Sequence, residues 1–351
     1  MGLLRVKGTI DINQFWPTGA GGNVLSDADT VHVKVDPKTS FVFEGNVTHA
    51  FDFAWIKTTK NPKDNTRKPD YVVVSQTTSN AHIKIRLQSI DAPELHYRLD
   101  QKKPEVRQNW GKRATLELRN FLKDRASGKM TIDCHVETLV NLPNDVFDIY
   151  GRFIGDIMIA DGSKIVNVNH WLVENGWAFP TFYNSAQFGE IDSIVQLWKK
   201  GKGGIRKSIV DRATNDMYGL PTGKAGDNPA QAKTDKGKVI LPKMFRRLVG
   251  FNENPKGAAT LADYLALPQN KRDLVIDLAA FKKLTPSQRQ NPTRKNSGVP
   301  LIRLNTLVKD GNRLAPEPET IVFVEKGATL KNNSGPVKGW TAQGIPVAKI
   351  K

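Results

Sequence analysis

The chain has 351 residues, of which 39% are hydrophobic and 25% are charged, a balance that fits a globular protein with a core and argues against wholesale disorder. The only cysteine is Cys134, which excludes a disulfide framework and a cysteine-based zinc site. Lysine and arginine number 52 against 35 acidic residues, and the formal charge of +17 favours a polyanionic partner such as nucleic acid. A basic protein without such a partner is the alternative.

The segment Met1–Lys7 lacks a basic start followed by an apolar stretch, so no secretory signal peptide is expected. The apolar runs of the chain are too short to span a bilayer. These features predict no membrane partner. They also predict either a cytoplasmic location or export by a route that does not use such a signal.

The chain divides into three regions. Strand and helix patterns fill residues 1–205, a basic glycine-containing linker follows at 206–238, and apolar periodicity returns in residues 239–351. Residues 36–80 interrupt the first region as an inserted hairpin. Its basic stretch, Lys57–Lys68, is either a solvated loop or an extension of a nucleic-acid groove.

The first region is expected to form a small β-barrel with helices packed outside it. Alternation of apolar and polar residues predicts five strands, at residues 3–12, 29–35, 83–87, 132–136 and 155–159. Helical spacing predicts helices at residues 114–122, 167–175 and 191–198, the second ended by Gly176. For the third region the patterns predict a small α+β module with helices at 241–249, 261–267 and 274–281 and strands at 301–308 and 320–325.

The most informative run is Ile83–Glu94, in which a strand ends and two carboxylates, Asp91 and Glu94, follow on the exit turn. Pro93 fixes this turn and biases Ala92 towards extended backbone. Together with Arg86 on the strand, these carboxylates can converge on one rim of the barrel. A polar turn that caps the next helix is the alternative.

Two further runs carry polar groups at strand ends. Asp27-Ala28-Asp29-Thr30 opens the second predicted strand, and its carboxylates either ligate a hard cation such as Ca²⁺ or form an Asx-turn. Asp148-Ile149-Tyr150-Gly151-Arg152 precedes another strand. Arg152 can clamp a phosphate through two parallel hydrogen bonds, or pair with Asp148 as a surface salt bridge.

Taken in order, these runs resemble the thermonuclease family, the staphylococcal-nuclease-like Ca²⁺-dependent nucleases. The family pattern is an Asp-Gly-Asp-Thr strand start, then an arginine followed five residues later by Asp-Thr-Pro-Glu, then Asp-x-Tyr-Gly-Arg. Here it reads Asp27–Thr30, Arg86 with Asp91–Glu94, and Asp148–Arg152, and the segment Val166–Ala178 is similar as well. The resemblance covers residues 1–205, with Ala28 in place of the usual glycine.

The resemblance implies an OB-fold five-stranded β-barrel with packed α-helices and a site on one face. It assigns the Ca²⁺ carboxylates to Asp29 and Asp91, with Ala92 contributing its backbone carbonyl and Asp27 lying behind them. Glu94 would be the general base or would orient the attacking water, and Arg86 and Arg152 would hold the phosphate. Substrate binding would fall to Tyr150 and, less securely aligned, to Tyr183 next to Phe182.

These roles suit phosphodiester hydrolysis, because charge builds on the non-bridging oxygens as water adds, and a cation with two guanidiniums stabilises it. The resemblance therefore implies a monomeric Ca²⁺-dependent nuclease that cleaves DNA, and RNA as a second substrate, with little sequence preference and 3′-phosphate ends. One rival is a non-catalytic OB-fold nucleic-acid-binding protein. Another is a scaffold whose C-terminal module recruits a partner that the sequence does not identify.

Overall fold

The structure of the chain is a computed structural model. It describes residues 2–15, 26–35, 40–44, 49–52, 56–58, 71–74, 82–100, 103, 106–140, 146, 148, 152–201, 203–205, 218–219, 233, 236–268, 273–310, 313–325, 329–332 and 335–336. Among these residues, no helix is both long and apolar enough to cross a membrane.

Five strands form a closed barrel: β1 (Gly2–Asp11), β2 (Thr30–Lys34), β7 (His82–Leu87), β10 (Thr131–Val140) and β11 (Phe153–Asp161). The order around the barrel is β1-β2-β7-β11-β10, and β10 pairs with β1 along the whole of that strand. Only the β7–β11 pair is parallel among these neighbours. The predicted OB-fold barrel is confirmed, because its strands carry alternating apolar residues whose inward faces are buried.

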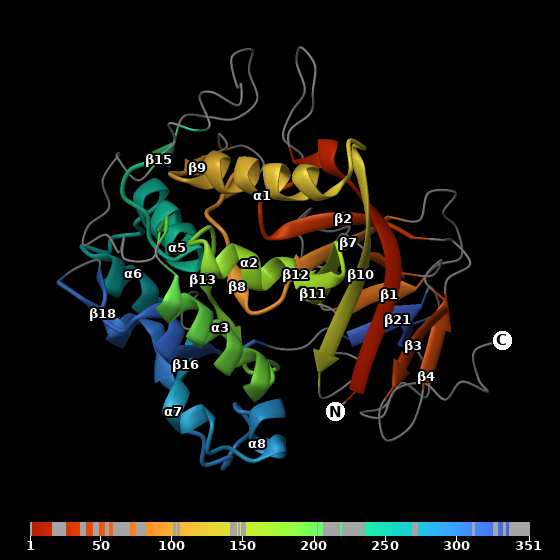
Figure 1. Ribbon diagram of the computed structural model, residues 1–351. Helices are drawn as coiled ribbons and strands as arrows, with labels where there is room; N and C mark the ends of the chain where they lie inside the picture. The colour runs from red at the N-terminus through yellow and green to blue at the C-terminus, as the bar shows by residue number, and fades with distance from the viewer. Residues whose placement is uncertain are drawn as a thin grey trace.

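Three helices cover this barrel: α1 (Gly111–Arg125), α2 (Val168–Glu174) and α3 (Phe188–Lys200). Helix α1 lies across one end of the barrel (Figure 1). Helix α2 packs against β11, and α3 packs against α2. All three helices were predicted from their spacing. Helix α2 begins after Asn167, whose side chain accepts a hydrogen bond from the His170 amide, and the chain turns at Gly176 with a φ of +69°.

The inserted segment adds strands rather than one simple hairpin. Strands β3 (Ser40–Glu44) and β4 (His49–Asp52) pair with each other and extend the barrel sheet at β1. Strand β5 (Ile56–Thr58) pairs with β6 (Tyr71–Val74), and β6 runs parallel to β21 (Thr329–Asn332). Most of the basic stretch from Lys57 to Lys68 lies outside the described residues.

Short elements connect the barrel and its helices. They are η1 (Ile12–Gln14), β8 (Ile90–Asp91), β9 (Arg107–Gln108), β12 (Lys164–Asn167), β13 (Phe179–Pro180), β14 (Phe182–Tyr183) and β15 (Tyr218–Gly219). Strand β15 lies in the predicted linker and pairs with β9, so this part of the linker is attached to the barrel region.

The C-terminal region contains both helices and strands. These are α5 (Pro242–Glu253), α6 (Leu261–Ala266), β16 (Leu274–Asp277), α7 (Leu278–Phe281), α8 (Pro286–Gln290), β17 (Ile302–Arg303), η6 (Leu304–Leu307), β18 (Val308–Lys309), β19 (Arg313–Leu314), η7 (Pro318–Thr320), β20 (Ile321–Phe323) and β22 (Gly335–Pro336). Helices α5 and α6 and strand β20 follow the sequence-based expectation.

Two expectations for this region were wrong. The predicted helix at 274–281 begins as β16, because Val275 and Ile276 are buried between β20 and β17, and only its second half is helical. Asp277 ends the strand and accepts a hydrogen bond from the Ala280 amide, which starts α7. The predicted strand at 301–308 is interrupted by the 3₁₀ turn η6.

The C-terminal region shares a sheet and a core with the barrel region. Strand β14 pairs in parallel with β20, so Phe182 lies opposite Val322 and Tyr183 opposite Phe323. The buried apolar residues form one continuous cluster that runs from the barrel strands through α3 to α5 and β20. Figure 1 shows the C-terminal helices gathered next to α3 on the same side as β8 and β13. This contact brings α5 to the barrel rim where the sequence motifs lie.

Candidate active site

The loop after β7 is held in place by backbone contacts on two sides. The Leu87 amide donates to the Asp29 carbonyl at 2.8 Å, which aligns the start of β2 with the end of β7. The turn then passes through Ser89, whose φ is +63°, into β8, where Asp91 lies opposite Phe179 of β13. The Glu94 carbonyl accepts from the Gln108 amide at 2.8 Å. The carboxylates therefore stand on a fixed frame.

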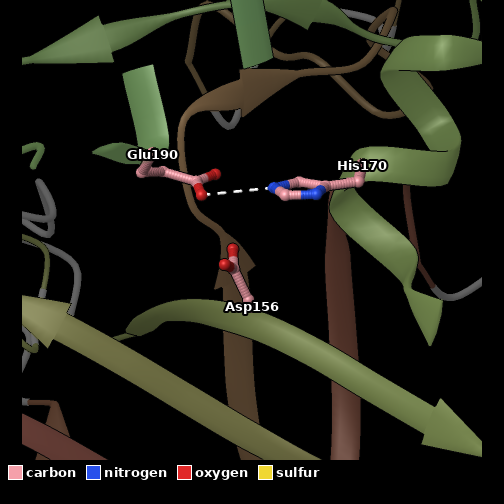
Figure 2. A group of neighbouring side chains, drawn as sticks. All are labelled: Asp156, His170 and Glu190. Carbon is pink, nitrogen blue, oxygen red and sulfur yellow. Dashed lines mark hydrogen bonds and ion pairs between the residues drawn. The ribbon is translucent and has the colours of Figure 1, made fainter. Parts of the chain in front are cut away.

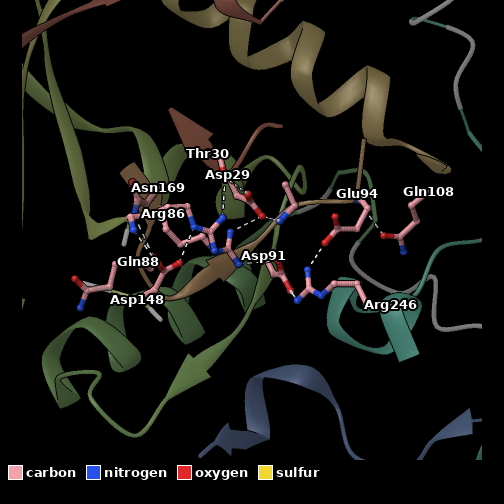
Figure 3. A network of polar contacts seen from close by, with 12 residues as sticks. Asp29, Thr30, Arg86, Gln88, Asp91, Glu94, Gln108, Asp148, Asn169 and Arg246 are labelled. Carbon is pink, nitrogen blue, oxygen red and sulfur yellow. Dashed lines mark hydrogen bonds and ion pairs between the residues drawn. The ribbon is translucent and has the colours of Figure 1, made fainter. Parts of the chain in front are cut away.

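Arg86 joins the two carboxylates that were expected to bind a metal. Its guanidinium forms an ion pair with Asp29, and its Nη2 donates to Asp91 Oδ1 at 2.7 Å (Figure 3). All three side chains are buried, Asp91 completely. Burial opposes the charge on Arg86, but Asp29 and Asp91 outweigh this effect and raise the pKa of the guanidinium.

Several donors and positive charges stabilise the charged form of Asp29. Burial alone would raise the pKa of Asp29, but Arg86, the Ala92 amide and Arg152 lower it below its ordinary value. The Ala92 amide donates to Asp29 Oδ2 at 2.8 Å, and the Thr30 hydroxyl donates to Oδ1 at 3.1 Å. Asp29 is therefore an anchored carboxylate near Ala92, as the motif order implied.

The pKa values of Glu94 and Asp27 are raised, in contrast to that of Asp29. Burial, together with Asp91 and Asp29, raises the pKa of Glu94 against the influence of Arg246. Burial, together with Glu94 and Asp29, raises the pKa of Asp27 well above its ordinary value. An acid with a raised pKa next to one with a lowered pKa is typical of sites that divide acid–base roles between carboxylates.

Arg152 reaches the same group from the far side. Its Nε donates to Asp148 Oδ2 at 2.6 Å, and its Nη1 donates to the Thr30 hydroxyl at 3.3 Å. Arg152 thus contacts the residue that hydrogen-bonds Asp29, and its charge helps to lower the pKa of Asp29. Tyr150 lies outside the described residues.

Tyr183 lies at the edge of this group, and its ring is in contact with the C-terminal region. Its ring centroid is 6.2 Å from that of Phe323, and the Lys243 ammonium lies 5.0 Å from it. Burial, followed by the effects of Glu325 and Asp91, raises the pKa of Tyr183. A nucleotide that stacked on this ring would have to share it with these neighbours.

Arg246 was not among the residues that the sequence motifs identified. Arg246 lies on α5, and its Nη2 donates to Asp91 Oδ2 at 3.2 Å while its Nη1 pairs with Glu94 (Figure 3). No local signal in the sequence identifies this contact, because Arg246 and Glu94 are 152 positions apart.

The residues fit a hard divalent cation. Asp29 and Asp91 both pair with the guanidinium of Arg86, so their carboxylates converge on one position where a positive charge lies. Calcium prefers carboxylate and carbonyl oxygens. Ala92 follows Asp91 in the chain, and its backbone N–H donates to Asp29 Oδ2. The donor set and its convergence are therefore suitable for Ca²⁺.

A second polar cluster lies behind α2, away from the motifs. It consists of Asp156 on β11, His170 on α2 and Glu190 on α3, and ligand atoms of the three lie within 4.8 Å of one another (Figure 2). His170 Nε2 and Glu190 Oε2 are 3.2 Å apart, and the carboxylate of Asp156 accepts from the Asn169 amide at 2.6 Å and from the Asn167 amide at 3.1 Å. These contacts give the cluster a structural role between strand and helices.

The closed five-stranded OB barrel has a rim on which buried acids pair with arginines. Comparison with protein families matches residues 84–207 to the family described as staphylococcal nuclease homologue. This match agrees with the family resemblance that the motifs predicted. The match begins after Asp29, whose place in the site comes from the β2–β7 pairing. No curated protein matched the chain closely enough to count as a relative.

Proposed function

We propose that the protein is a Ca²⁺-dependent phosphodiesterase that hydrolyses DNA, and RNA as a second substrate, with little sequence preference and 3′-phosphate ends. The observation that carries this proposal is the convergence of Asp29 and Asp91 on one guanidinium with Glu94 beside them. The net charge of +17 supports a nucleic-acid substrate.

In this proposal Asp29, Asp91 and the Ala92 carbonyl hold the ion, which when bound supplies charge stabilisation at the phosphate. Arg86 and Arg152 bind the phosphate oxygens, because a planar guanidinium can donate two parallel hydrogen bonds that a lysine cannot. Glu94 takes the proton of the attacking water, or orients that water, and its raised pKa makes it a more effective base near neutral pH. Asp27 supports Asp29 from behind, and Tyr150 and Tyr183 contact the substrate.

The test is plasmid nicking by the purified full-length chain in Ca²⁺ and in EDTA. We expect nicking in Ca²⁺, no nicking in EDTA, and a loss of at least about 100-fold in rate for Asp91→Asn. Asp133→Asn, on β10 and hydrogen-bonded to Thr9 on the exposed side of the barrel, should retain the wild-type rate. Full activity in EDTA contradicts the proposal.

One observation favours a second candidate, a non-catalytic nucleic-acid-binding protein. Both oxygens of Asp91 are paired with arginines, and Glu94 is paired with Arg246, so the acids already have cationic partners. In this case the wild-type chain shifts a labelled oligonucleotide on a gel but leaves plasmid intact across a panel of divalent metals. The two assays together separate the candidates.

A further inference from the structure

Contacts of the residues just before α5 fix this helix against the nuclease domain. The Trp110 indole donates to the Gly237 carbonyl at 2.8 Å. The side-chain amide of Asn109 donates to the Lys238 carbonyl at 3.1 Å, and the side-chain amide of Gln108 donates to the Ile240 carbonyl at 2.5 Å. Buried side chains of α5, Met244, Phe245 and Leu248, then pack into the shared core. Arg246 is therefore delivered to the site by a docked helix and not by a loose surface segment.

Arg246 occupies acceptor oxygens of both Asp91 and Glu94. Asp91 gives Oδ1 to Arg86 and Oδ2 to Arg246, and Glu94 gives Oε1 to Arg246. The two acids and the basic residue belong to different regions of the chain, so the C-terminal region contributes directly to the charge balance of the candidate site.

The two arginines differ in how firmly they are held. Each arginine pairs with two carboxylates, but the Arg86 side chain is 10% exposed whereas the Arg246 side chain is 28% exposed. A divalent ion that binds Asp91 is repelled by any guanidinium on the same carboxylate, and in a buried site this repulsion is only weakly screened. Arg246, the more exposed of the two, is the one that can move towards solvent.

We propose that Arg246 sets the divalent-cation affinity of the candidate site by competing with the ion for Asp91 and Glu94. The inference deepens the proposed function and rests on it. In this view the C-terminal region raises the Ca²⁺ concentration that the nuclease domain requires, since each binding event must displace an internal cation.

The experiment is calorimetric titration of Ca²⁺ into the full-length protein and three variants. Arg246→Ala should bind Ca²⁺ at least about tenfold more tightly than the wild type, because removal of a nearby positive charge removes the competition. Arg246→Gln keeps a hydrogen-bond donor for the buried acids without the charge. It should also bind Ca²⁺ more tightly than the wild type, even if the alanine variant folds poorly. Circular dichroism confirms folding of each variant.

The matched control is Arg247→Ala. Arg247 is the next residue on α5, but its ion-pair partner is Asp273, with Nη2 2.8 Å from Oδ1, instead of Asp91 or Glu94. Its removal should leave Ca²⁺ affinity at the wild-type value. A similar gain in this control would mean that α5 acts through its total charge or its docking, and would overturn the assignment to Arg246.

The outcomes also separate this inference from the proposed function. Unchanged or weaker Ca²⁺ binding in both Arg246 variants, with Ca²⁺-dependent nicking intact in the wild type, overturns the role of Arg246 alone. No Ca²⁺ binding and no nicking by the wild type overturns both. Tighter Ca²⁺ binding in the Arg246 variants, with no nicking by any of the proteins, supports the competition and overturns the proposed hydrolytic activity.

Discussion

Asp156 is a buried acid whose surroundings disfavour its charge. Burial and the nearby Glu190 raise the pKa of Asp156 well above its ordinary value, against the hydrogen bonds from Asn167 and Asn169. A native-state pKa above the unfolded value means that the folded protein binds more protons in the pH range between the two values. The free energy of unfolding therefore falls as the pH rises from about 4 through this range.

Replacement of this acid should remove that pH dependence. In Asp156→Asn, the free energy of unfolding relative to wild type should rise by at least about 1 kcal/mol between pH 4 and pH 7, since each pKa unit corresponds to ~1.4 kcal/mol. Urea unfolding at the two pH values, followed by circular dichroism, measures this difference. A difference that stays constant or shrinks as the pH rises contradicts the raised pKa.

Single residues also show which parts of the candidate site could be predicted from the sequence. The proximity of Asp29, Arg86 and Asp91 was predictable, because each stands at a strand end and neighbouring strands bring such ends together. Arg246 was not predictable, because its contact depends on how α5 docks. The group of Asp156, His170 and Glu190 was not predictable either, because the three residues come from separate elements.

At the scale of elements, periodicity identified most of the barrel and failed where a segment was short. Residues 274–281 read as a helix, yet Val275 and Ile276 pair in a sheet and only residues 278–281 turn helical. The three-residue apolar run Leu274–Ile276 is compatible with either structure, and tertiary packing decides between them. The elements that position the candidate site, β2, β7 and β11, are longer and alternate clearly, and they were therefore predictable.

The end of α2 depends on a close approach between glycines. Gly176 has a φ of +69°, and a Cβ at this position would collide with the backbone of Gly203 and Gly204. Gly176→Ala should therefore lower the free energy of unfolding by more than the ~1–3 kcal/mol that a left-handed non-glycine residue costs by itself. Urea unfolding measures the change.

Gly128 provides the matched control for this element. Its φ is +82°, but a Cβ there would meet nothing within 4 Å, so Gly128→Ala carries the backbone cost alone. The difference between the two variants isolates the contact of α2 with residues 203–204. Equal losses in both would show that this close approach contributes nothing to stability.

At the scale of the whole molecule, the barrel and the C-terminal region are joined through β14 and β20. Phe323 is 1% exposed, and its ring contacts Tyr183 and the Lys243 ammonium, the latter at 4.6 Å. The same junction carries α5, and with it Arg246, to the acids of the barrel rim. Stability and the candidate site are thus coupled across the two regions, which composition and linker patterns along the sequence did not indicate.

Because the core is continuous, we expect the described regions to unfold together. Phe323→Ala should lower the free energy of unfolding by about 3–5 kcal/mol, the usual cost of removing a buried aromatic ring. Differential scanning calorimetry should show one transition for the wild type, moved as a whole to lower temperature in the variant. Leu139→Ala, at a side chain that is 39% exposed, is the control and should change stability by less than about 0.5 kcal/mol. Two transitions, of which Phe323→Ala moves only one, would show that the barrel and the C-terminal region fold separately, and Arg246 would then reach Asp91 only while the two regions are docked.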